Sequence, residues 1–133
     1  MEILVHHIYE LQKGLRNLVL HTMPASLLLL AKEKLEVHGM PYIIKNVSPD
    51  KINIIFGARE CVEVVASFGN KDLTELTPEE DFILGIMLGY CRIQQCRRFI
   101  KRKNSKTNVH IHYPKSNELR LQPHPIADSS VIY

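Results

Sequence analysis

Basic residues gather in one short stretch of this 133-residue chain. Seven lysines and arginines, and no acidic residue, lie between positions 92 and 106. The candidate partner-binding residues in this stretch are Arg92, Arg97, Arg98, Lys101, Arg102 and Lys103. Dense positive charge attracts acidic proteins, nucleic acids and anionic membrane surfaces. It is also typical of a solvated helix end that complements the helix dipole, so both interpretations stay open at this point.

The charge of the chain is divided unevenly along its length. Residues 1–91 carry eight Lys/Arg and twelve Asp/Glu, whereas residues 92–133 carry nine and two. Such asymmetry indicates an interaction segment. An acidic protein is favoured over a nucleic acid as the partner, because Phe99 is the one aromatic residue within the cluster and single-strand binders use several.

The histidines are a weaker candidate for chemistry. His6, His7 and His21 are expected on neighbouring strands, where histidines on one face could bind a transition metal. No Cys-x-x-Cys or His-Glu-x-x-His motif accompanies them. We therefore interpret them as polar residues that fill strand positions, and we expect no metal site.

The cysteines give no catalytic pattern. Cys61, Cys91 and Cys96 are odd in number and lack the spacing of a disulfide framework, which favours reduced thiols and a cytoplasmic location. No paired carboxylates, catalytic triad or cofactor fingerprint is present, so we expect neither catalytic residues nor a cofactor. A redox or small-ligand protein that uses Cys61 or Cys91 in a cleft between sheet and helices is one alternative.

Hydrophobic patterning and turn residues predict the local structure. The N-terminus lacks a signal peptide, and the longest apolar runs are too short to cross a bilayer, so no membrane contact is expected. We expect strands over residues 3–10, 15–21, 42–47 and 52–56, and helices over residues 22–38, 58–68 and 77–103.

The last of these helices is the most clearly marked. Thr77 and Pro78 form a strong helix start, which Glu80 completes as a capping box. If the helix runs to Lys103 it is roughly 39 Å long. Gly85 and Gly89, four residues apart, would share one face and allow close packing within the chain or, alternatively, a homodimer contact.

These elements predict an α+β fold. A right-handed crossover between strands 15–21 and 42–47, with strand 52–56 between them, gives most of a ferredoxin-like split βαβ unit. We therefore expect a four-stranded antiparallel sheet of order 1-2-4-3, with about three helices on one face. Residues 1–103 would form a single domain, and residues 104–133 a loosely ordered, basic, proline-containing tail.

Several motifs resemble a small bacterial family of domains of unknown function. The motifs that carry the resemblance are His6-His7-Ile8-Tyr9-Glu10-Leu11-x-Lys13-Gly14, Leu18-x-Leu20-x-Thr22, Lys51-Ile52-Asn53-Ile54-x-Phe56-Gly57-x-x-Glu60-Cys61-Val62, Leu76-x-Pro78-Glu79-Glu80-Asp81-Phe82-Ile83-Leu84-Gly85 and Leu88-Gly89-Tyr90. The resemblance covers about residues 1–103 and assigns no catalytic residue. The chain is similar to proteins that are encoded beside a flavodoxin, and this resemblance implies an acidic electron-transfer partner.

The leading hypothesis is therefore a non-enzymatic interaction or regulatory module. Its basic residues would bind an acidic protein, for which a flavodoxin is the specific candidate. A nucleic-acid binder that uses the same residues, and the small-ligand or redox protein, are the alternatives.

Overall fold

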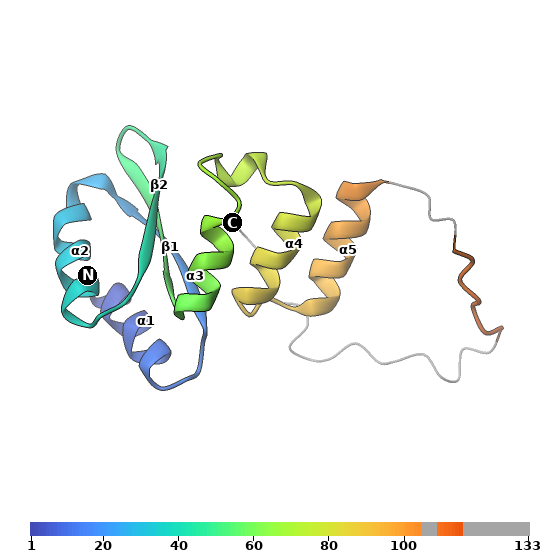
Figure 1. The fold of residues 1–133 in the computed structure, drawn as a ribbon, viewed down its shortest axis with the longest axis horizontal. Helices are drawn as coiled ribbons and strands as arrows, with labels where there is room; N and C mark the ends of the chain where they lie inside the picture. The colour runs from blue at the N-terminus through green and yellow to red at the C-terminus, as the bar shows by residue number, and fades with distance from the viewer. Residues whose placement is uncertain (105–108, 116–133) are drawn as a thin grey trace.

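A computed structural model describes residues 1–104 and 109–115 (Figure 1). Most of the predicted tail, 104–133, lies outside these residues. Among the described residues, no helix has the length and apolar character needed to cross a membrane. The elements are α1 (Glu2–Gln12), β1 (Leu18–Pro24), a 3-10 turn (Ala25–Leu27), α2 (Leu28–Val37), β2 (Tyr42–Ser48), β3 (Lys51–Gly57), α3 (Arg59–Ala66), a second 3-10 turn (Leu73–Glu75), α4 (Pro78–Met87) and α5 (Arg92–Lys103).

The described residues form an α+β fold around a three-stranded antiparallel sheet of order β1-β3-β2. The predicted four-stranded sheet of order 1-2-4-3, with three helices, is wrong, because the expected first strand is helix α1. Leu4 and Ile8 are completely buried, while Ile3 and Val5 are exposed. The four-residue spacing of the buried pair matches a helix, and it outweighs the alternation of apolar residues.

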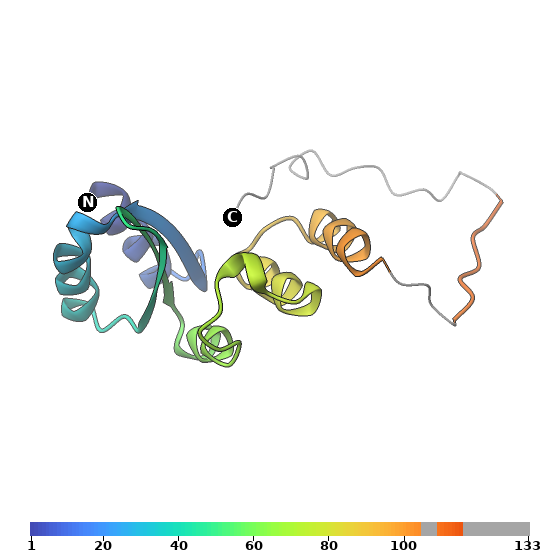
Figure 2. The ribbon, with the colours of Figure 1, turned by 90° about the horizontal axis from the view of Figure 1, so that it is seen from above.

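Helices cover both faces of the sheet, and the prediction that they lie on one face is also wrong (Figure 2). The centre of β3 explains why, since Ile54, Ile55 and Phe56 are consecutive and fully buried. Successive side chains of a strand point to opposite faces, so such a run requires a cover on each side. Helices α1 and α2 cover Ile54 and Phe56, while α3 and α4 cover Ile55.

Two apolar clusters result, one on each side of the sheet. The first consists of Leu4, Ile8, Val19, Met23, Ala31, Leu35, Ile52, Ile54 and Phe56. The second consists of Leu18, Ile55, Val62, Val65, Leu76, Leu84 and Leu88. We refer to residues 1–76, which contain the sheet and most of both clusters, as the sheet body.

The predicted long helix is two helices, α4 and α5, which lie side by side in both ribbon views (Figures 1 and 2). Its start is as expected, since Thr77 and Glu80 form a capping box. Gly89 ends the first helix with a φ angle of +81°, in the left-handed region that glycine tolerates. Gly85 and Gly89 therefore do not share a helix face.

Candidate partner-binding site

The basic end of α5 lies against the acidic start of α4. The carboxylate of Asp81 is buried, and Arg98 donates to it twice, from Nε to Oδ2 at 2.8 Å and from Nη2 to Oδ1 at 3.1 Å. Arg102 adds an ion pair from Nη1 to Oδ1 at 3.2 Å. Paired, charge-assisted hydrogen bonds of this kind are strong, so Asp81 fixes α5 antiparallel to α4.

Further contacts extend this arrangement. Arg102 Nη2 donates to the carbonyl of Leu76 at 2.9 Å, and Lys103 forms an ion pair with Glu79. The hydrogen bond from Lys103 lowers the pKa of Glu79, and that from Lys71 lowers the pKa of Glu80. We call the antiparallel pair α4 and α5 the helix hairpin. Three of the six candidate residues, Arg98, Arg102 and Lys103, therefore hold it together.

The other three candidates differ in their surroundings. Arg92, Arg97 and Lys101 are exposed, and the described part of the chain offers them no ion-pair partner. Arg92 lies at the opposite end of α5, where it lines a groove with Arg16 and Tyr90. Arg97 and Lys101 lie one helical turn apart and leave two positive charges directed at solvent.

Two isoleucines lie beside these charges. Ile93 and Ile100 are 55% and 68% exposed, and their spacing of seven residues places them on one face of α5. Together with Arg97 and Lys101 they form a surface that we call the α5 outer face. The sequence prediction missed the isoleucines, although the 93, 97, 100, 101 spacing on a helix was a sufficient signal.

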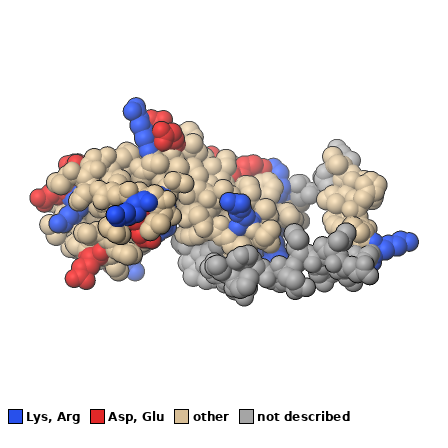
Figure 3. Space-filling model, turned by 90° about the horizontal axis from the view of Figure 1, so that it is seen from below, with Lys and Arg blue, Asp and Glu red and all other residues tan. Residues whose placement is uncertain are grey.

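Charge elsewhere on the surface is more evenly mixed. In the view of Figure 3, Lys and Arg side chains lie among Asp and Glu side chains, with neutral surface between them. On α3, Arg59 forms an ion pair with Glu63 at 3.0 Å. The α5 outer face combines unpaired positive charge with exposed apolar surface, and this makes it the best candidate for a docking site.

The histidines and cysteines give little support for catalysis. His7 lies on α1 and His21 on β1, with ring centroids 5.5 Å apart, and burial lowers the pKa of both. No group of three or more possible ligands in the described part of the chain could hold a metal ion. Burial, with a smaller effect of Glu60, raises the pKa of the Cys61 thiol, which opposes its use as a thiolate.

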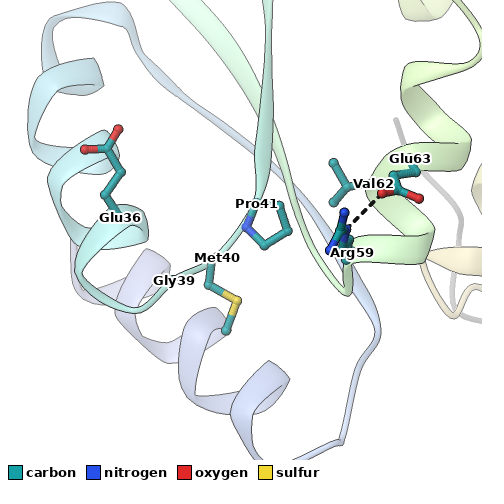
Figure 4. A pocket seen from close by; sticks show the side chains of 7 residues that line it. All are labelled: Glu36, Gly39, Met40, Pro41, Arg59, Val62 and Glu63. Atoms are coloured by element: carbon teal, nitrogen blue, oxygen red, sulfur yellow. Dashed lines mark hydrogen bonds and ion pairs between the residues drawn. The ribbon is translucent and has the colours of Figure 1, made fainter.

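An open pocket of about 570 Å³ lies away from α5, between the end of α2, the start of β2, and α3 (Figure 4). Met40, Pro41 and Val62 supply its apolar lining, and Glu36, Arg59 and Glu63 stand at its rim. It contains none of the candidate partner-binding residues. The pocket lies beside the edge strand β2, and any role in binding would involve that strand.

Comparison with protein families gives one match. Residues 2–102 match the family described as "Protein of unknown function (DUF2023)". The chain belongs to this family. The predicted resemblance to a domain family of unknown function is thereby confirmed, whereas bacterial origin and a link to flavodoxin stay predictions. The comparison with curated proteins finds no match.

Proposed function

We propose that this protein is a non-enzymatic interaction module whose α5 outer face binds an acidic protein. The main support is the combination, on one helix face, of Ile93 and Ile100 with Arg97 and Lys101. Interfaces generally place apolar side chains at the centre and charged groups at the rim. The isoleucines would supply contact area, and the cations would select and orient a partner of opposite charge.

The ion pairs of the helix hairpin make this surface possible. Because Asp81 and Glu79 engage Arg98, Arg102 and Lys103, α5 is positioned by its inner side. The side chains on its outer side do not hold the helix in place. Residues there can be chosen for binding, since their replacement costs little stability.

A nucleic acid is a poorer candidate. Phe99 packs against Phe82, with ring centroids 5.5 Å apart, so the aromatic residue of the cluster is not free to stack on a base. Half of the candidate cations are also engaged in ion pairs, which reduces the charge available to phosphates.

A flavodoxin is the specific partner that we propose. The family resemblance motivates this choice, and flavodoxins are strongly acidic. Complementary charge would speed their encounter with α5, and the rate would fall as salt rises.

The test is the affinity for a purified flavodoxin, measured by titration calorimetry at low and high salt. We expect binding that weakens with salt, and a loss of about tenfold in affinity for Arg97→Gln/Lys101→Gln. The control Lys13→Gln/Lys34→Gln removes the same charge from the residue that follows α1 and from α2, and it should bind as the unaltered chain does. Ile93→Ala/Ile100→Ala should weaken binding at both salt concentrations.

Two outcomes would overturn the proposal. One is the absence of binding, or binding that salt and the α5 substitutions do not change. The other is tight binding of a DNA or RNA oligonucleotide with a steep salt dependence and no binding of flavodoxin, which would favour the nucleic-acid alternative.

A further inference from the structure

Strand β2 lies at an edge of the sheet and pairs only with β3 among the described residues. Its other side faces the space between α2 and α3, where the pocket of Figure 4 opens. A second groove, of about 380 Å³, continues along the strand. It is lined by Ile43–Asn46, by the end of α3, and by Gly69, Asn70 and Asp72 of the loop that follows α3. An edge strand with open space beside it is a template for another strand.

The register shows which backbone groups of β2 are unpaired. Gly57 N–H donates to the carbonyl of Pro41 at 3.4 Å, so the odd-numbered residues from position 41 direct their groups at β3. Because this direction alternates in an antiparallel pair, Tyr42, Ile44 and Asn46 direct theirs outward. Outside the β2–β3 ladder, no backbone hydrogen bond reaches these three within the described chain. Water can satisfy such groups one at a time, whereas another extended backbone matches their spacing along the whole strand.

The opposite edge of the sheet is less suited to pairing. On β1 the same alternation directs the groups of Leu18, Leu20, Thr22 and Pro24 outward. Pro24 has no N–H to donate, and Leu18 is fully buried. Proline on an edge strand commonly prevents a further strand from adding. The edge of β2 contains no proline between Tyr42 and Ser48.

We propose that β2 pairs antiparallel with β2 of a second copy of this chain, with Ile44 at the two-fold axis. The two three-stranded sheets would join into one of six strands. In this register Ile44 faces Ile44, and Tyr42 faces Asn46 at both ends. All the outward N–H and C=O groups of these residues are then used, two hydrogen bonds for each facing pair.

The side chains of β2 are complementary to themselves in this register. Val47 is 53% exposed and lies at the register shift between Asn46 and Ser48. In the dimer it would lie near Pro41 of the second copy, beside the apolar pocket that Met40 and Val62 also line. The contact occurs twice because a two-fold interface is isologous. Each copy thus places an exposed apolar residue against an apolar pocket of the other copy.

The polar groups match as well. The hydroxyl of Tyr42 donates to Glu36 at 2.7 Å on the exposed surface, and Asn46 of the second copy would bring an amide donor opposite Tyr42. Lysine on an edge strand often blocks pairing, but Lys45 Nζ donates to the carbonyls of Gly69 and Lys71 at 3.3 and 2.9 Å. Its charge is held within the chain, and it would face Ile43 rather than another cation.

Sedimentation velocity of the full chain, from micromolar to sub-millimolar concentration, tests the proposal. We expect a species of twice 15.3 kDa that dissociates on dilution. Asn46→Pro removes an outward N–H and keeps the backbone groups that Ile43 and Lys45 direct at β3. Val47→Lys puts a charge at the apolar pocket of the second copy. Both should shift the dimer dissociation constant at least about tenfold towards monomer.

A control variant and a second measurement separate loss of pairing from loss of folding. Val5→Lys makes the same side-chain change on α1, which packs beside β1, and should leave the dimer intact. Hydrogen exchange at the amides of Tyr42, Ile44 and Asn46 should slow with protein concentration in the unaltered chain. In Asn46→Pro, where residue 46 has no amide hydrogen, exchange at Tyr42 and Ile44 should not depend on concentration.

Three outcomes would overturn the proposal. These are a monomer at every concentration, a dimer that both β2 variants leave unchanged, and a dimer without concentration-dependent protection of the three amides. A monomeric chain that gains this protection on adding an unrelated extended peptide would assign the edge to a different partner. The flavodoxin measurement does not depend on this result, because α5 and β2 are separate surfaces.

Discussion

The sheet body and helix α5 are held in place by different forces. The body buries two apolar clusters on the two sides of β3. Helix α5 buries one residue fully, the polar Gln95, and is attached to α4 through Asp81, Arg98 and Arg102. Burial of apolar area resists salt, whereas ion pairs with exposed members are screened by it.

This difference suits the two proposed surfaces. A strand edge needs a rigid sheet, which the clusters around Phe56 and Ile55 provide. A charged helix that binds a partner needs cations on its outer side, and ion pairs on its inner side keep the helix in place without covering them. The comparison predicts that the two regions will respond differently to mutation, salt and pH.

The largest effect is expected in the sheet body. Phe56→Ala removes a fully buried ring from the first cluster and should destabilise the protein by about 3–5 kcal/mol, with little dependence on salt. Urea unfolding at two salt concentrations measures it. Tyr113→Ala, at a residue that is 79% exposed, is the matched control. A small loss for Phe56→Ala would mean that the body does not depend on its core.

An intermediate effect is expected in the helix hairpin. Asp81→Asn keeps the shape but removes the charge that Arg98 and Arg102 share, and it should cost about 2 kcal/mol, below the range for fully buried pairs because both arginines are partly exposed. Hydrogen exchange should speed up in α5 before it does in β3. Glu79→Gln, at the exposed pair, is the control and should change little. Equal exchange in α5 for wild type and Asp81→Asn would contradict the proposed attachment.

The smallest effect is expected from pH, and the two regions should lose stability in different pH ranges. Burial lowers the pKa of His7 and His21 below 6.5, so the unfolded chain binds protons more readily than the folded one. The body should therefore lose stability as pH falls below 6.5. Chemical denaturation at a series of pH values measures the loss, and His21→Gln should reduce it.

The hairpin should respond at lower pH. The hydrogen bonds from Lys103 and Lys71 lower the pKa of Glu79 and Glu80 below 4.5, so their contribution is present above 4.5 and is lost as pH falls through the folded-state values. Glu79→Gln/Glu80→Gln should reduce the loss of stability below pH 4.5 and leave the loss that begins at pH 6.5 unchanged. If stability falls with pH in a single step that neither His21→Gln nor Glu79→Gln/Glu80→Gln alters, the distinction between the two regions is wrong.

Local features of the sequence determined several elements. The β-branched runs and the Pro49-Asp50 turn predicted β2 and β3 to within one residue at each end, and the capping box predicted the start of α4. Gly39 ends α2 as predicted, with a φ angle of +66°. These features act over a few neighbouring residues, so the sequence alone expresses them.

Only the tertiary structure decided the rest. Whether residues 2–12 form a strand or a helix depends on which surface buries Leu4 and Ile8, and that surface is made by β1, β3 and α2. The expected long helix breaks at Gly89, and its two charged ends meet at Asp81 only because the chain folds back there. The sequence determined that α5 is basic. The fold determined that Arg98, Arg102 and Lys103 face inward and that Arg97 and Lys101 face solvent, because an ion pair depends on distance in space and not along the chain.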